Sequence, residues 1–209
     1  MNTQAKIVDK ALELFNERGI EYVGLRELAA LLGIRVSNIT YYFPTKDDLV
    51  NHLSLELNLL NSKVIIENDK LTMQSFLEML NSVFINHLKF RCLLLSFVHL
   101  MEQNKIMSAR YQKTQKIRNA TLKSNIEVLV RLEYLNFKDE DDSEFLVSAI
   151  ALIARFWISE AAVSFRHLSS EEQINHYLSM IAKLLLPYST AKAKREIRIF
   201  LRKRINGLP

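Results

Sequence analysis

The chain has 209 residues, with four glycines and three prolines, and it carries a formal net charge of +5 at pH 7. No alternating apolar pattern bounded by turn residues occurs, which argues against a β-rich fold and predicts an all-α fold with room for one small and one medium domain. A single cysteine, Cys92, excludes a disulfide framework and predicts a reducing, cytoplasmic location.

The positive charge is concentrated near the C-terminus. Residues 1–50 hold six basic and seven acidic side chains, whereas residues 190–209 hold seven basic side chains and one acidic side chain. The net charge is therefore weak evidence that the N-terminal part binds nucleic acid, and that inference depends on motifs.

Residues 1–20 predict an amphipathic helix, because Ile7, Ala11 and Phe15 lie on one face and charges occur along the whole segment. This pattern is not that of a signal peptide. The next helix is predicted over residues 25–32, where apolar residues recur at helical spacing.

Both ends of this second helix carry recognisable signals. Gly24 precedes it as a cap, and Glu27, at the third position, is expected to reach back towards the open backbone N–H groups. Gly33 follows the last apolar position, where a left-handed residue is favourable. A tight turn at Gly33 is therefore predicted to join this helix to the next one.

A third short helix is predicted after Gly33, with Ile39 and Phe43 facing inward. Its remaining side chains are short and polar, or aromatic. Two short helices joined by a tight turn are the layout of a helix-turn-helix motif, whose second helix enters the major groove of DNA. Short side chains permit a deep fit in the groove, and Tyr and Thr hydroxyls reach phosphates.

Pro44 ends this helix, and Thr45 caps the following one with Asp48 at its third position. Lys46 falls in the first turn, where its ammonium and the free backbone N–H groups suit a phosphate oxygen. The predicted DNA-contacting residues are Arg26, Arg35, Val36, Ser37, Asn38, Thr40, Tyr41, Tyr42 and Lys46.

Four motifs in this stretch resemble, in order and spacing, those of the TetR family of bacterial transcriptional regulators. Gly24-Leu-Arg-Glu-Leu-Ala29 is similar to that family's Thr-Val-Arg-Asp-Ile-Ala, and Leu32-Gly33 is similar to its Ala/Leu-Gly turn. Ile39-Thr-Tyr-Tyr-Phe43 is similar to its Leu-Tyr-Tyr-His-Phe, and Lys46-Asp-Asp-Leu49 to its Lys-Glu-x-Leu. The resemblance covers about residues 5–55.

The departures from the family pattern fall on the outward face. The usual Ser two positions after the turn glycine is Arg35, the usual Lys-Gly pair is Val36-Ser37, and the first Tyr is Thr40. The inward-facing residues that hold the fold together match the family pattern. The resemblance therefore predicts the fold but does not predict the operator sequence.

Past residue 50 the apolar spacing predicts one helix after another. An acidic cluster over residues 139–142 is expected just before a helix N-terminus, where negative charge is favourable. Helices are expected over residues 46–66, 71–88, 91–101, 106–135, 144–168, 171–186 and 190–206.

The run from Phe145 to Phe165 is apolar enough to raise the alternative of a membrane span. Arg155 and Glu160 interrupt it, which favours a helix buried at a dimer interface; no membrane span is expected. Its alanines permit close helix approach. The predicted dimer-interface residues are Ala154, Ile158, Ala161, Ala162, Phe165, Tyr177 and Ile181.

Large apolar side chains are candidates for a ligand pocket, although core packing alone accounts for the same composition. No nucleophile–base set, Gly-rich phosphate loop or metal-ligand spacing occurs, so no enzyme activity, cofactor or metal is expected. The candidate pocket residues are Phe76, Met79, Phe84, Phe97, Met101, Met107, Phe156 and Trp157.

The basic C-terminal segment has an apolar stripe of Ile197, Leu201 and Ile205. We expect a helix that packs this stripe on the domain and leaves the Lys/Arg face in solvent. A helix that contacts a membrane or an acidic partner is the alternative.

The sequence therefore predicts a helix-turn-helix DNA-binding domain over residues 1–46 and a helical regulatory and dimerisation domain over residues 47–209. One such DNA-binding domain covers little groove, so a homodimer on double-stranded DNA with a palindromic operator is expected. The resemblance implies a repressor that a small ligand, expected to be apolar, releases from DNA. The alternative is a regulator whose larger domain binds a protein or membrane surface.

Overall fold

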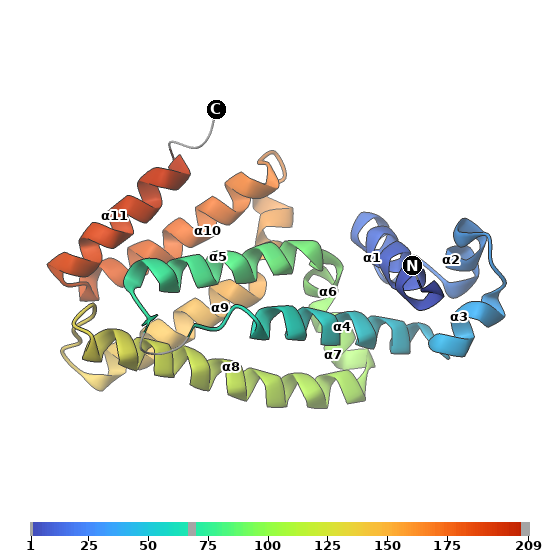
Figure 1. The fold of residues 1–209 in the computed structure, drawn as a ribbon, viewed down its shortest axis with the longest axis horizontal. Helices are drawn as coiled ribbons and strands as arrows, with labels where there is room; N and C mark the ends of the chain where they lie inside the picture. Colours follow the sequence, from blue (N-terminus) through green and yellow to red (C-terminus); the bar gives the residue numbers. More distant parts are fainter. Residues whose placement is uncertain (1, 67–69, 206–209) are drawn as a thin grey trace. The chain divides into compact units, whose positions relative to one another are not determined.

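The computed structural model describes residues 2–66 and 70–205, and helices account for most of them (Figure 1). The all-α prediction is confirmed. The α-helices are α1 (Thr3–Arg18), α2 (Leu25–Leu32), α3 (Val36–Tyr42), α4 (Lys46–Ser62), α5 (Met73–Lys89), α6 (Arg91–Leu95), α7 (Phe97–Gln103), α8 (Lys105–Arg131), α9 (Glu140–Ser164), α10 (Ser170–Leu185) and α11 (Ala191–Ile205).

The chain divides into two compact units. The first unit holds residues 1–62 and 86–111, and the second holds residues 63–85 and 112–209. The first unit therefore contains more of the chain than the predicted domain of residues 1–46, because α4 and α6 pack on α1, α7 packs on α6, and Met107 of α8 belongs to the same core cluster.

The core of the first unit follows the predicted pattern. Leu28, Ala29, Ile39 and Phe43 are all buried, as their helical spacing indicated. Asn16 of α1 ties the later helices to this core, because its Nδ2 donates to the Lys89 carbonyl at 2.8 Å and its Oδ1 accepts from the Cys92 N–H at 3.0 Å. These contacts join segments more than 70 residues apart in the chain.

The turn between α2 and α3 has the predicted left-handed glycine. Gly33 has φ 65° and ψ 30°, and the Ile34 N–H donates to the Ala29 carbonyl at 3.0 Å. Gly24 is the N-cap, as expected, but the expected role of Glu27 is wrong. Its carboxylate accepts a hydrogen bond from the Arg18 guanidinium, which offers a charged donor in place of the open N–H groups.

The helix boundaries of the second unit follow their caps. The Asp139 side chain accepts from the Asp142 N–H at 3.0 Å and caps α9. The acidic cluster is at a helix N-terminus as expected, but the helix begins at residue 140 and not at residue 144, so residues 140–142 belong to its first turn and not to a preceding loop. Ser169 and Glu172 form a reciprocal capping box at the start of α10. The segment 91–101 differs from the prediction, because it forms two short helices, α6 and α7, that meet at Ser96.

Aromatic side chains fill the centre of the second unit. Phe84 of α5 stacks on Trp157 of α9 with ring centroids 4.9 Å apart and planes 10° from parallel. Tyr177 of α10 lies next to Trp157, with centroids 5.7 Å apart. These contacts join α5, α9 and α10 around one core.

The helix α11 packs one face on the second unit. Ile197 is fully buried, as the predicted stripe requires, and Leu201 is half-buried. The side chain of Ile205 lies outside the described residues. Ala193 and Phe200 are also buried and extend the packed face.

Within the described residues, one helical segment, Asp141–Ser164, is long and apolar enough to cross a membrane by length and composition alone. In its most apolar window, 28% is buried inside the chain. Much of this apolar helix surface is therefore left uncovered by the chain itself.

Candidate DNA-binding interface

The helix α3 has a buried side and an exposed side. Ile39 is fully buried, whereas Ser37, Asn38 and Tyr41 are exposed. These three lie on one side of the helix, because positions three and four residues apart are neighbours on a helix surface. Their short polar side chains and one aromatic ring face solvent, where base edges can reach them.

Two tyrosines end α3 in different surroundings. Tyr41 is 81% exposed, whereas Tyr42 is half-buried, and their rings meet edge to face with centroids 5.0 Å apart. Tyr42 and Val36 pack partly against the hydrophobic core. These two predicted DNA-contacting residues therefore also support the position of α3, a role that the sequence did not indicate.

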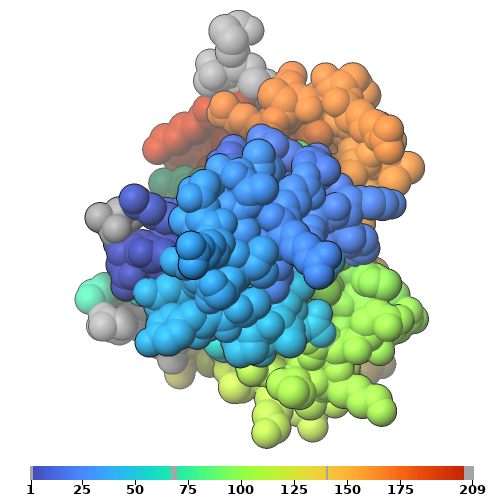
Figure 2. All heavy atoms as spheres, turned by 90° about the vertical axis from the view of Figure 1, so that its right-hand side faces the viewer, coloured from blue at the N-terminus to red at the C-terminus, as the bar shows by residue number. Residues whose placement is uncertain are grey.

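The other predicted polar contacts flank this face. Arg26 of α2 and Arg35, the N-cap of α3, are exposed. Thr40 is half-buried, and its hydroxyl donates to the Ser37 carbonyl at 3.4 Å. In Figure 2 the blue and light-blue residues of α2, α3 and the beginning of α4 form one continuous surface towards the viewer.

Lys46 is the first residue of α4 and is half-buried. Its Nζ donates to the Ile20 carbonyl at 2.9 Å and lies 3.5 Å from the Glu21 carbonyl. The turn before it has the predicted capping box, since the Thr45 N–H donates to Asp48 Oδ2 at 2.9 Å and the Asp48 N–H donates to Thr45 Oγ1 at 3.2 Å. An ammonium has three donors, so one remains for a phosphate oxygen.

Sequence comparison covers both units. A family model described as "Bacterial regulatory proteins, tetR family" matches residues 7–53, and a model described as "Bacterial transcriptional repressor" matches residues 56–197. The chain belongs to the TetR family. The fold and the family are those of transcriptional regulators.

Individual relatives agree with the TetR assignment. A "Probable HTH-type transcriptional regulator YttP" of Bacillus subtilis (strain 168) is 38% identical over 56 residues, which is 27% of this chain and 27% of that protein. A crystal structure of a TetR-family transcriptional regulator from Marinobacter aquaeolei VT8 matches with TM-score 0.89 at 21% identity, over 98% of this chain and 99% of that chain. A regulator from Saccharomonospora viridis in complex with choline matches with TM-score 0.67 at 16% identity, over 85% and 94% of the two chains.

The predicted ligand-pocket residues of this TetR-family chain are divided between the two units. Five of them belong to the second unit: Phe76, Met79, Phe84, Phe156 and Trp157. Of these, Phe76, Phe84 and Trp157 are buried in its core. The other three, Phe97, Met101 and Met107, belong to the first unit. Of these, Met107 is buried.

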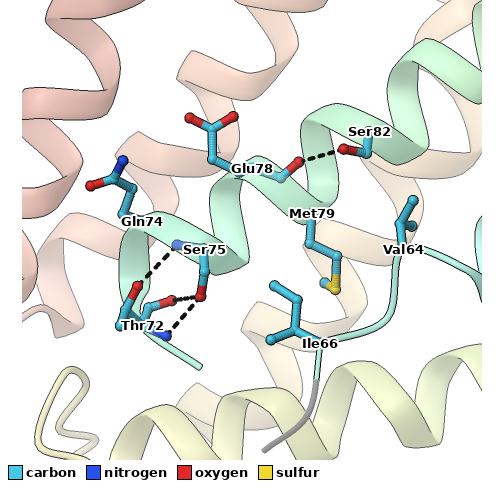
Figure 3. A pocket seen from close by; sticks show the side chains of 8 residues that line it. All are labelled: Val64, Ile66, Thr72, Gln74, Ser75, Glu78, Met79 and Ser82. Atoms are coloured by element: carbon cyan, nitrogen blue, oxygen red, sulfur yellow. Dashed lines mark hydrogen bonds between the residues drawn. The ribbon is translucent and has the colours of Figure 1, made fainter. Parts of the chain in front are cut away.

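A groove of about 440 Å³ opens beside the N-terminal half of α5 in the second unit (Figure 3). Of the predicted pocket residues only Met79 lines it. Figure 3 shows Met79 pointing towards Val64 and Ile66 of the segment that follows α4. The remaining lining residues are polar, and sequence reasoning missed them because it followed large apolar side chains; they are Thr72, Gln74, Ser75, Glu78 and Ser82.

The predicted dimer-interface residues lie largely inside the chain's own fold. Ile158, Ala161, Tyr177 and Ile181 are buried within the second unit. The remaining three, Ala154, Ala162 and Phe165, are half-buried.

The exposed apolar surface of α9 lies on other residues. Phe145 is 57% exposed, Leu152 is 58% exposed and Val163 is 76% exposed. Spacings of seven and eleven residues put all three on one face of the helix. An apolar stripe in this arrangement is typical of a surface that another protein surface covers.

Proposed function

We propose that this TetR-family chain is a repressor that binds a palindromic operator as a homodimer in the cytoplasm and leaves it when a small ligand binds. The observation that carries the DNA-binding part is the face of α3. Ser37, Asn38 and Tyr41 are exposed opposite the buried Ile39, which is how a recognition helix presents base-reading side chains.

The proposed operator contacts divide into two kinds. Ser37 and Asn38 carry hydroxyl and amide groups that hydrogen bond to base edges, so we assign them base recognition. Arg26, Arg35 and Lys46 carry positive charge, and we assign them to backbone phosphates. Val36, Thr40, Tyr41 and Tyr42 complete the proposed contact surface.

Dimerisation is proposed through α9 and α10. The apolar stripe of Phe145, Leu152 and Val163 is exposed in the single chain, and α10 packs alongside α9. Two such helix pairs related by a two-fold axis make a four-helix interface. A two-fold axis matches a palindromic operator, since each recognition helix then meets an equivalent half-site.

Ligand release is proposed through the second unit. The groove beside α5 has a volume within the range of small-molecule sites and combines apolar and polar lining residues. Structurally similar proteins include a gamma-butyrolactone receptor and the choline complex, which supports a small molecule as ligand here. A ligand that favours one conformation of the second unit shifts the population that binds DNA.

Selection from a random-sequence duplex pool tests the DNA-binding part. An enriched inverted repeat is expected, because a two-fold dimer reads two equal half-sites. A pool that stays unenriched contradicts the proposal. A thermal-shift screen with small apolar and amphipathic molecules then tests the ligand part, and a ligand that raises the melting temperature must also lower operator affinity.

A further inference from the structure

The outward face of α11 is strongly basic. Glu196 is the single acidic residue of this helix, and its carboxylate is turned into the fold. There it accepts hydrogen bonds from the Gln74 N–H at 2.9 Å and from the Tyr134 hydroxyl at 3.2 Å. Glu196 is therefore half-buried and occupied, and it does not neutralise the basic side chains on the solvent side.

Two of the basic side chains of α11 also serve the fold. Lys192 Nζ lies 3.8 Å from the centre of the Tyr134 ring. Arg204 donates to Asn175 Oδ1 at 2.9 Å, and its other terminal nitrogen lies 3.7 Å from a Glu78 carboxylate oxygen. These contacts explain how the two ends of α11 are held against the second unit.

The other basic side chains point away from the fold. Arg195, Arg198 and Arg202 are exposed and recur at spacings of three and four residues, so they form one stripe along the helix. This arginine stripe is about 10 Å long, from the rise of 1.5 Å per residue. Lys194 and Lys203 are exposed beside it, and within the part of the chain that the structure describes none of the five makes an ion pair.

We propose that this arginine stripe is a second DNA-binding surface, which holds the phosphate backbone of duplex DNA without regard to sequence. Guanidinium groups bind phosphate oxygens with paired hydrogen bonds, and a row of them matches a row of phosphates. The segment that holds the helix-turn-helix is not basic, since residues 1–50 carry seven acidic and six basic side chains. The arginine stripe therefore adds a concentration of positive charge to the phosphate contacts of the helix-turn-helix, and positive charge is what sequence-independent DNA affinity depends on.

The packing of α11 favours DNA over a lipid surface as the partner. A membrane-binding amphipathic helix inserts its apolar face among the acyl chains. In α11 that face is occupied, because Ala193, Ile197 and Phe200 are buried in the second unit. The outward face presents positive charge with little apolar surface. Positive charge is sufficient for binding to the phosphate backbone of DNA.

A fluorescent probe on the stripe tests this directly. Ile199 is exposed beside the arginines, and the natural Cys92 is buried, so Ile199→Cys gives one reactive thiol for labelling. The full-length labelled protein is titrated with a duplex of scrambled sequence at several salt concentrations. The probe signal must change on DNA addition, and for three arginine–phosphate contacts the affinity at this site falls about 40-fold between roughly 50 and 200 mM salt.

Matched variants separate charge on the stripe from total charge. The triple change Arg195→Gln, Arg198→Gln and Arg202→Gln must abolish the response, whereas changing the same three residues to Lys must keep it. The control changes three exposed lysines of α8 to Gln and must leave the response unchanged; these are Lys113, Lys116 and Lys123.

Three outcomes overturn the proposal. The first is an unchanged fluorescence of the label on Ile199→Cys when DNA is added to the protein, after circular dichroism has shown that the protein is folded. The second is an equal loss in the α8 control, which shows an effect of total charge. The third is a response to vesicles that contain phosphatidylserine, with none to DNA. Because operator selection is measured separately, failure here leaves the proposed repressor function untouched.

Discussion

Lys46 Nζ donates a hydrogen bond to the carbonyl oxygen of Ile20 across 2.9 Å, although the two residues are 26 positions apart in the chain. The contact ties the first turn of α4 to the segment between α1 and α2. The same ammonium retains a donor for DNA phosphate. Lys46 therefore links the internal order of the helix-turn-helix to its proposed contact with the DNA backbone.

Lys46→Ala is expected to weaken binding to every duplex sequence by about tenfold, because a charged hydrogen bond to phosphate is lost. The slope of the logarithm of the binding constant against the logarithm of the salt concentration should become less steep by about one unit. The free energy of unfolding should also drop by about 1 kcal/mol, since the Ile20 contact disappears. Fluorescence anisotropy with operator and scrambled duplexes, and urea unfolding, measure these changes.

The control for this prediction is Lys105→Ala, which removes an exposed lysine at the start of α8. It should alter neither stability nor binding. A changed base preference in Lys46→Ala contradicts the phosphate role, because backbone contacts carry no sequence information.

Ser37→Ala and Asn38→Ala are expected to change which bases are preferred, with a loss of about 1–3 kcal/mol of discrimination at the affected position. Both side chains are exposed, so stability should change by less than about 0.5 kcal/mol. Selection from a random pool with each variant gives the result. If both variants select the same operator motif as the natural protein, Ser37 and Asn38 do not recognise bases. Asn119→Ala on α8 serves as the neutral control.

The local structure of the first unit could be predicted because its signals are local. The left-handed Gly33, the Thr45–Asp48 capping box and the inward Ile39 each depend on residues within a few positions. The acceptors of Lys46 are distant in the sequence, and so no pattern indicates them. The prediction for Glu27 failed for the same reason, since its partner Arg18 lies on another helix.

The surface of the second unit was harder to predict than its helices. The apolar content of the sequence predicts a buried helix that includes Ala161 and Val163. It does not predict whether the chain itself or a second copy of the chain covers each residue. In the structure Ala161 is covered by the chain itself, whereas Val163 is 76% exposed. Relative rotation of α9 against α10 decides this, and that rotation depends on packing of the whole unit.

Gly33→Ala is expected to lower the free energy of unfolding by about 1–2 kcal/mol, because a left-handed φ of 65° is unfavourable for a residue with a Cβ. No atom lies within 4 Å of the added Cβ, so the effect is conformational and not a clash. Gly24→Ser is the matched change, since its φ of −99° suits any residue and a Ser there can cap α2. It should leave stability equal or raise it, and chemical unfolding compares the two; equal losses contradict the argument.

Burial raises the pKa of the Cys92 thiol from its usual 9.0 to about 12. The folded protein should therefore resist a thiol reagent at neutral or mildly alkaline pH, whereas the protein in urea reacts fully. Because the thiol ionises more readily in the unfolded chain, stability should fall as the pH rises from about 9 towards 12, by up to about 1.4 kcal/mol per pH unit. Cys92→Ala should lack this part of the pH dependence; a rapid reaction of the folded protein contradicts the burial.

Leu152→Arg combined with Val163→Arg is expected to produce a monomer, because two charges then lie in the middle of the proposed apolar interface of α9. Both residues are exposed in the single chain, so the fold should be kept, whereas Ala161→Arg would disrupt the core and could not test the interface. Operator affinity should fall by about a hundredfold or more, since two linked half-site contacts become one. Light scattering at micromolar concentration and operator titration measure both effects, with Ile117→Arg on an exposed apolar site of α8 as the control. A double variant that remains dimeric shows that the two-fold contact lies elsewhere on the chain.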